Sequence, residues 1–330
     1  AEDNEMLYLF SGIVMLAVWL FYERSQRKTF SVKAGLNAKL TLPHEDAWIL
    51  YNNQFSLCSK KLRVCLAEYD VTYTSKHVDL IETGSYENIS RGFLKINPAG
   101  TVPVLLHNGN PIYESHEQLK YIAEQVDKQN LLVPADDSQL LIMNQWLHKS
   151  SLLGDDPINN ATQTAANAVP GLTIPIFAAM IKHVPTYKIL EGLLFHRMKV
   201  RPVFFLVMRL LGMNRTLRLK PLQNMIHKSW AAMSDHLDEL EGQLSSSGGP
   251  WICGHQFTLA DVGMMAIFDR LNEGDWLAVF TPSRVAVHAY WEALQSRESY
   301  IKGFQNHNHP LVLTATEKIK NLKKEGQWPL

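Results

Sequence analysis

The strongest constraint on what this chain can fold into is an uninterrupted apolar run close to its N-terminus. Residues 6–22, MLYLFSGIVMLAVWLFY, carry no charge. As a helix they rise about 26 Å, the short end of the length that crosses the hydrocarbon core of a bilayer. A buried core helix would show a polar face, and this run has none. A signal peptide would carry a basic n-region and a small-residue cleavage site, and this run has neither of those. The sequence therefore predicts a transmembrane anchor at residues 1–28.

The charges that flank this run predict its orientation. Three acidic residues precede it, namely Glu2, Asp3 and Glu5. Five basic residues follow it, namely Arg24, Arg27, Lys28, Lys33 and Lys39. Because basic flanks are retained on the cytoplasmic side, we expect a single pass with the rest of the chain in the cytoplasm. The three cysteines suit neither a disulfide framework nor a zinc site, and they fit a reducing compartment.

The composition is typical of a folded protein with two domains. The chain has 330 residues, of which 46% are hydrophobic and 19% are charged, so extensive disorder is excluded and two cores can form. Lys+Arg and Asp+Glu both number 32, so the whole molecule has no basic bias towards nucleic acid. We therefore predict no nucleic-acid partner.

After a predicted linker at 29–46, residues 47–130 follow the order of a thioredoxin-like domain. Four short apolar runs predict strands, at 48–51, 71–78, 102–106 and 111–113. Asn108-Gly109 between the last two strands predicts a hairpin turn. Three segments predict helices, at 59–69, 86–94 and 116–126, of which the second has the weakest pattern. The resulting order is strand–helix–strand, a helix, and then strand–strand–helix.

Beyond Pro134 the sequence predicts helices. The clearest one repeats apolar residues at spacings of 4 and 3 from Ile226 to Leu244. Another begins at Thr258, where Asp261 three positions on completes a capping-box pattern, so we interpret Asp261 as a folding element and not as a catalytic acid. We assign 131–312 to an all-helical C-terminal domain and 313–330 to a tail.

A segment at about 157–225 is predicted to be an insertion in the helical domain. Basic residues are frequent between 157 and 234, where the only acidic residue is Glu191. Very apolar stretches at 172–181 and 203–211 alternate with these charges. Basic residues beside apolar faces suit an anionic membrane surface. They suit a solvated helical hairpin packed on its own domain equally well, and the sequence does not choose between the two.

Four stretches between Ala47 and His309 resemble glutathione transferases. They are Ser56-Leu57-Cys58 at the start of the first helix, 97–105 with its candidate cis-proline, Glu114-Ser115 after the last strand, and 251–261 in the helical domain. The first stretch is similar to the zeta-like classes of that family. The resemblance implies an α/β thioredoxin-like domain followed by an all-α glutathione transferase C-terminal domain, here preceded by one transmembrane helix.

The chemistry of such an enzyme explains why a hydroxyl or thiol is needed at a helix start. Glutathione is an anionic tripeptide, and its thiolate is the nucleophile. A donor at a helix N-terminus favours the thiolate, because the helix dipole and the free N–H groups favour negative charge. By the resemblance, Ser56 would bond the sulfur, and an ordinary N-cap is its alternative role. Cys58 is the second catalytic candidate, as a redox cysteine.

The resemblance also implies which residues bind glutathione. A cis bond before Pro103 would let Val102 present its N–H and C=O to the cysteinyl unit, as an added strand would. Glu114 and Ser115 would hold the γ-glutamyl amine and carboxylate, and a strand end followed by an N-cap is the alternative for this pair. Glutathione is therefore the expected co-substrate.

Two functions stay open at this point. The first is a membrane-anchored enzyme that conjugates, isomerises or reduces an apolar electrophile with glutathione. The second is a non-catalytic membrane-bound scaffold or glutathione sensor, because the chain is also partly similar to the ganglioside-induced differentiation associated proteins. The expected partners are glutathione, a lipophilic small-molecule substrate and membrane lipids, with a second copy of the chain as a further candidate.

Overall fold

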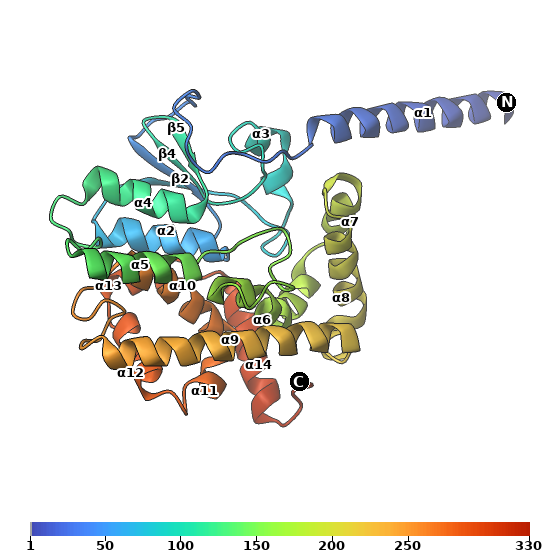
Figure 1. The fold of residues 1–330 in the computed structure, drawn as a ribbon. Coiled ribbons are helices and arrows are strands. Elements are labelled where there is room, and N and C mark those ends of the chain that lie inside the picture. The colour runs from blue at the N-terminus through green and yellow to red at the C-terminus, as the bar shows by residue number, and fades with distance from the viewer. Residues whose placement is uncertain (1) are drawn as a thin grey trace.

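One helix stands apart from the rest of the molecule. The structure is a computed structural model that describes residues 2–330, and in it α1 (Glu2–Gln26) projects away from the folded body (Figure 1). Ala1, the first residue of the predicted anchor, and the side chains of Glu2 and Asp3, which enter the predicted orientation, lie outside the described part. Asn4–Gln26 is long and apolar enough to cross a membrane, and no part of it is buried.

The sheet has the predicted thioredoxin-like order, with one strand more than predicted. Its strands are β1 (Gly35–Leu36), β2 (Trp48–Asn52), β3 (Thr74–His77), β4 (Val104–His107) and β5 (Asn110–Tyr113). They are ordered β1-β5-β4-β2-β3, with β2 and β3 parallel and the other pairs antiparallel. The predicted linker at 29–46 is therefore not only a linker, because Gly35 pairs with Tyr113 at the edge of the sheet.

Alternate residues of the strands bury opposite faces of the sheet, as the period of two requires. Leu50, Leu105 and Ile112 face the core shared with α2 (Leu57–Glu68) and α4 (Ser115–Val126). Ile49 and Val104 instead face a smaller cluster that contains Phe93. The predicted helix at 86–94 is two short pieces, η1 (Glu87–Ile89) and α3 (Arg91–Leu94).

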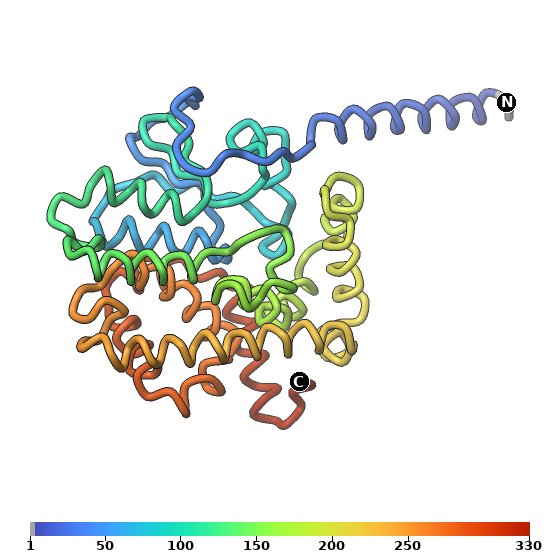
Figure 2. The backbone as a smooth tube through the Cα atoms, viewed as in Figure 1, coloured from blue at the N-terminus to red at the C-terminus, as the bar shows by residue number. Residues whose placement is uncertain are grey.

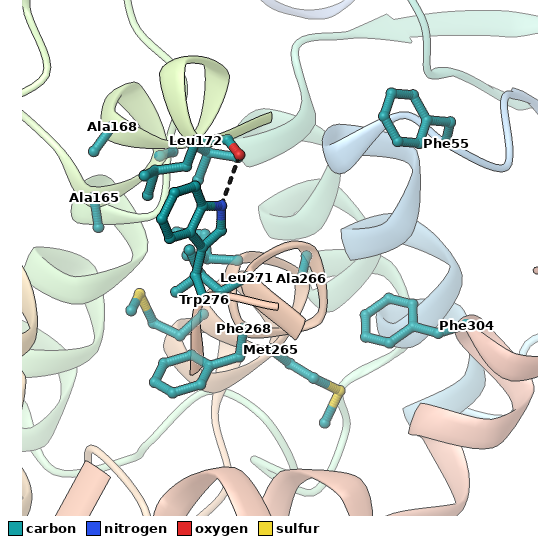
Figure 3. Close-up of a cluster of buried hydrophobic side chains, with 14 of the residues drawn as sticks. Phe55, Ala165, Ala168, Leu172, Met265, Ala266, Phe268, Leu271, Trp276 and Phe304 are labelled. Carbon is teal, nitrogen blue, oxygen red and sulfur yellow. Dashed lines mark hydrogen bonds between the residues drawn. The ribbon is translucent and has the colours of Figure 1, made fainter. Parts of the chain in front are cut away.

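The rest of the body is helical, and among residues 2–330 no strand follows β5. Its helices outside the predicted insertion are α5 (Asp137–Lys149), α9 (Lys220–Ser246), α10 (Leu259–Glu273), α11 (Leu277–Phe280), α12 (Val285–Gln295), α13 (Glu298–Gly303) and α14 (Pro310–Lys324), with η3 (Gln305–His307) between the last two. The capping box at the start of α10 is formed by Thr258 and Asp261, which confirms the folding role predicted for Asp261. The C-terminal end of α10 leads to Trp276, whose indole N–H donates to the Leu172 carbonyl over 2.8 Å (Figure 3).

The predicted insertion and the predicted tail both contribute helices that pack on the body. The first apolar stretch of the predicted insertion belongs to α6 (Ala165–Met180), which is almost wholly buried and packs on α9, so it is part of the core. The segment outside that core is η2 (Ile181–His183), α7 (Thr186–Phe195) and α8 (Val200–Thr216). The predicted tail forms most of α14, which also packs on α6 (Figure 2).

Candidate active site

The N-terminus of α2 carries both predicted catalytic residues. Ser56 is its N-cap, and the Ser56 hydroxyl accepts a hydrogen bond of 3.2 Å from the backbone N–H of Ser59. The N-cap role considered for Ser56 is therefore real. It does not use up the hydroxyl, which still has a proton to donate. Cys58 is half-buried in the first turn, where backbone N–H groups have no partner within the helix.

The loop before α2 is held from several sides, which fixes the direction of Ser56. The amide of Asn53 donates to the Val78 carbonyl over 2.9 Å, and its oxygen accepts from the Phe55 N–H at 2.9 Å. From the helical domain, Arg270 donates to the Phe55 carbonyl and lies 3.7 Å from the centre of the Phe55 ring. The helix start is thus preorganised by contacts that belong to both domains.

A cavity of about 270 Å³ opens beside this helix start. Of the residues predicted for the site, it brings together Ser56, Cys58 and Val102. Pro103, Glu114 and Ser115 do not line it. Its other walls come from the loop after β3, from α6 and from the loop between α7 and α8, and they include Glu82, Tyr86, Phe177, His196 and Arg201. Both predicted catalytic residues, one predicted glutathione-binding residue and the segment outside the helical core therefore meet at one cavity.

The peptide bond between Val102 and Pro103 is cis, as predicted. Val102 is half-buried, and its backbone N–H and C=O have no hydrogen-bond partner among residues 2–330. The next carbonyl, that of Pro103, accepts from the side-chain amide of Gln118 over 3.0 Å. The edge beside the cavity therefore offers one donor and one acceptor from the same residue, which is the pattern an extended peptide can pair with.

Glu114 has a backbone that an ordinary N-cap does not need. Its φ is 67° and its ψ is 122°, a combination that costs a non-glycine residue roughly 1–3 kcal/mol. Its exposed side chain forms no cap hydrogen bond to α4, so the N-cap alternative does not account for its carboxylate. Ser115 is buried at the first position of α4, and its hydroxyl has no partner within the described part of the chain.

The sequence analysis missed the buried cations of α2. Lys60, Lys61 and Arg63 are nearly inaccessible to solvent. Lys60 contacts Asp269 at 2.5 Å and Glu273 at 2.6 Å, both on α10. Lys61 donates to the Ser150 carbonyl, and burial lowers the pKa of its amine, a shift that the nearby Cys58 thiol opposes. The sequence did contain an indication of this burial. Helix α2 has one apolar face, and cations so close together in its sequence cannot all lie on the opposite face, which is exposed to water.

The polar wall opposite Ser56 was also missed. Arg201 forms an ion pair with Glu82, whose side chain is almost fully buried. Burial and then the neighbouring Arg201 lower the pKa of His196, so this imidazole is neutral at pH 7. No short motif marks these residues, because they come from separate loops that meet through the packing of α7 on α8.

Models of protein families match both halves of the body. Residues 55–125 match the N-terminal domain of glutathione S-transferases, and residues 229–308 match their C-terminal domain. The segment between the two matches includes α6, α7 and α8.

Individual proteins agree with these matches. The chain is 24% identical over 262 residues to glutathione S-transferase TCHQD of Arabidopsis thaliana, covering 77% of this chain and 88% of the relative. It is 22% identical to the tetrachloro-p-hydroquinone reductive dehalogenase of Sphingobium chlorophenolicum, covering 76% and 93%. The solved structure of the beta-etherase LigF from Sphingobium has the same fold, with a TM-score of 0.62 at 19% identity over 79% of this chain and all of that one. The chain belongs to the glutathione S-transferase superfamily.

Proposed function

We propose that this glutathione transferase-like enzyme, whose co-substrate is glutathione, acts on a lipophilic electrophile at a membrane to which α1 anchors it. The observation that carries the proposal is one cavity lined by the start of α2 and by the unpaired backbone of Val102. A scaffold would have no need of a hydroxyl donor and a free strand edge on the same cavity. The names of the relatives, a transferase and a reductive dehalogenase, support transfer and reduction as reaction types.

The residues predicted to bind glutathione suit its chemistry, although of these only Val102 lines the cavity. The N–H and C=O of Val102 would pair with the backbone of the cysteinyl unit. The exposed carboxylate of Glu114 would hold the γ-glutamyl amine, and the free hydroxyl of Ser115 would bond its carboxylate. The cost of the unusual Glu114 backbone supports such a role, since strain of this kind persists where function uses it.

The helix start would then favour the thiolate. The hydroxyl of Ser56, already oriented by the N–H of Ser59, would donate its proton to the sulfur. The dipole of α2 and its free N–H groups add to this effect. The thiolate would attack an electrophilic carbon, and the leaving group would depart with the electron pair. Cys58 would instead serve thiol exchange, in which its thiolate attacks a disulfide sulfur and releases the other thiol.

The membrane part of the proposal rests on α1. Its residues Asn4 to Gln26 have a mean hydropathy of 1.7 in the most apolar window, and none of that window is buried in the body. We propose a single pass with the folded body on the cytoplasmic side. The second apolar helix long enough to span, Ala165–His183, is 83% buried in the body, so the proposal does not include it as a span.

Glutathione binding tests the proposed function. We expect titration calorimetry of the full chain in phosphatidylcholine nanodiscs to give a dissociation constant between micromolar and millimolar. Glu114→Ala should weaken binding roughly 10- to 100-fold, because a hydrogen bond to a charged group is lost. Glu117→Ala, which removes another carboxylate from the first turn of the same helix, is the matched control and should bind as the wild type does. Absence of heat at millimolar glutathione, with folded protein, would refute the enzyme.

A further inference from the structure

The end of α1 is fastened to the folded body by Arg27. This side chain is buried, and its guanidinium donates to the Ile89 carbonyl over 2.9 Å and to Glu191 over 2.7 Å. It also lies 4.3 Å from the centre of the Phe195 ring. Ile89 belongs to the thioredoxin-like domain, whereas Glu191 and Phe195 belong to α7. Arg27 therefore ties the anchor to both.

A second contact fixes the level of the body along α1. Arg91, at the start of α3, forms an ion pair with Glu23 and lies 4.8 Å from the centre of the Tyr22 ring. Tyr22 ends the apolar run, so a helix that crosses a bilayer would leave the hydrocarbon at this residue. The surface of the body around α3 and α7 is thus held at the level where the membrane would end.

Helices α7 and α8, here called the α7–α8 hairpin, run along the side of the body from which α1 projects (Figures 1 and 2). The outward face of this hairpin is apolar. On α7, the exposed residues Tyr187, Leu190 and Leu194 are spaced 3 and 4 apart and so share one face. On α8, Val200 and Leu210 are 79% and 75% exposed. Large apolar side chains at this exposure over two neighbouring helices mark an interaction surface.

The unpaired charges in and beside the hairpin are of one sign. Exposed lysine and arginine side chains without an acidic partner among residues 2–330 occur at Lys182, Arg197, Lys199, Arg215, Arg218 and Lys220. The only acid of the hairpin, Glu191, is taken up by Arg27. Partial burial and then the positive charge of Arg24 on α1 lower the pKa of Lys199.

We infer that the α7–α8 hairpin is a second membrane-contact element, which lies with its apolar face in the surface of an anionic bilayer beside α1. The inference rests on the proposed function, in which α1 crosses that bilayer. Its basis is continuity with the anchor, together with the match between exposed cations and anionic lipid headgroups.

The hairpin also connects this surface to the cavity. His196 and Arg201 line the cavity beside Ser56, while Arg197, Met198 and Lys199 between them are exposed. The loop that joins α7 to α8 therefore has one side towards the membrane and the other towards the site. This arrangement assigns the second substrate to lipophilic molecules dissolved in the bilayer, which would enter beside the loop without first crossing water.

Spin labels in the full chain test the contact. Cys58→Ala leaves Cys65 and Cys253 buried, so a single added cysteine is the reactive one. Labels at Tyr187→Cys, Val203→Cys and Leu210→Cys report on the hairpin, and Ile13→Cys reports on α1. Leu313→Cys, an exposed leucine of α14, is the matched control. The protein is reconstituted in phosphatidylcholine vesicles with or without phosphatidylserine, and accessibility to oxygen and to a water-soluble nickel chelate is measured.

We expect the ratio of oxygen to nickel accessibility to be higher at 187, 203 and 210 than at 313, and to rise further with phosphatidylserine. If the accessibility ratio at these three positions equals that at position 313, while the label at position 13 is in lipid, the hairpin is solvated. The inference is then wrong, although α1 is still an anchor. If 13 is also exposed to the nickel chelate, the anchor itself is wrong and the inference falls with it.

Discussion

At the scale of the residue, two neighbouring side chains present different chemistry to one cavity. Ser56 accepts a hydrogen bond from the Ser59 N–H and keeps a proton to donate. Cys58 lies one helical turn before Lys61; burial lowers the pKa of the Lys61 amine, and the nearby Cys58 thiol opposes that shift. A hydroxyl donor suits stabilisation of a bound thiolate, whereas a free thiol at a helix start suits thiol exchange.

This difference predicts that the two residues serve different reactions. Ser56→Ala should lower kcat/KM for conjugation of a chloronitrobenzene by roughly 10- to 100-fold, because a hydrogen bond to a charged sulfur is lost. Cys58→Ala should instead abolish exchange with a mixed disulfide of glutathione. Ser56→Thr keeps the hydroxyl and is the control for conjugation. If Cys58→Ala removes both activities and Ser56→Ala neither, the roles assigned here are wrong.

How far the sequence predicts the site depends on whether a residue's role is local. The sequence placed Ser56 and Cys58 at a helix start, and the cis bond before Pro103, because a turn and a cap are set by adjacent residues. It missed His196 and Arg201, because their place at the cavity depends on how α7 packs on α8 and how α8 packs on α6. The roles of Glu114 and Ser115 in binding stay predictions.

At the scale of the element, α2 and α10 join the domains through charge. Lys60 of α2 is enclosed by Asp269 and Glu273 of α10, and the Tyr300 hydroxyl donates to Asp269 over 2.8 Å. The two carboxylates are close together and buried, so they depend on the cation between them.

Removing that cation should therefore be costly. Lys60→Met keeps most of the side-chain volume but leaves the buried Asp269 without the cation it contacts, while Glu273 keeps its ion pair with Arg270, and we expect a loss of about 3–5 kcal/mol in the free energy of unfolding. Urea denaturation followed by circular dichroism measures it. Lys95→Met, at an exposed lysine, should change the free energy little. An equal effect of the two substitutions would show that the buried ion pair contributes nothing to stability.

What the sequence does not predict at this scale has one physical cause. The first apolar stretch of the predicted insertion lies in the buried α6, and most of α14 lies in the predicted tail; periodicity shows that a helix has an apolar side but not what covers it. The pair Gly35–Leu36 is too short to give a strand pattern and exists through its pairing with β5. Long elements with a clear period were predicted, and elements defined by their neighbours were not.

At the scale of the whole molecule, the junction of the two domains should weaken in acid. Burial and then the nearby Arg63 lower the pKa of His307 to about 4, against about 6.5 in an unfolded chain. Between these values the unfolded chain binds a proton that the folded chain does not. The free energy of unfolding therefore falls as pH falls from 6.5 to 4.

His307→Gln should make this loss smaller, because the glutamine does not titrate. Urea denaturation at pH 7 and at pH 4.5 measures the difference for each protein. His288→Gln, at a more exposed histidine on α12, is the control and should keep the wild-type slope. If His307→Gln also keeps that slope, the acid sensitivity lies elsewhere.

The topology can be tested with acceptors already in the chain. Asn88-Ile89-Ser90, Asn160-Ala161-Thr162 and Asn214-Arg215-Thr216 are glycosylation sequences if they enter a secretory lumen, and Asn214 is the most exposed of the three asparagines. In a eukaryotic host we expect all three to stay unmodified and the protein to resist carbonate extraction. A glycosylation sequence added after Leu330 reports in the same way on the C-terminal end, and we expect it to stay unmodified too. A glycosidase-sensitive mass shift would reverse the orientation, and release by carbonate would rule out a spanning α1.

The buried cations of α2 also bear on how the protein is made. Lys60 is synthesised 209 residues before Asp269, which at about 5–20 residues per second is a delay on the order of 10 to 40 seconds. During that time α10 has not been synthesised, so the face of the first domain on which it packs is exposed to water. Because this face carries Lys60, Lys61 and Arg63, water can solvate it while the ribosome completes the chain. An apolar face in the same position would promote aggregation of the nascent protein. We therefore expect the charges that join the two domains in the folded protein to limit aggregation of the first domain during synthesis.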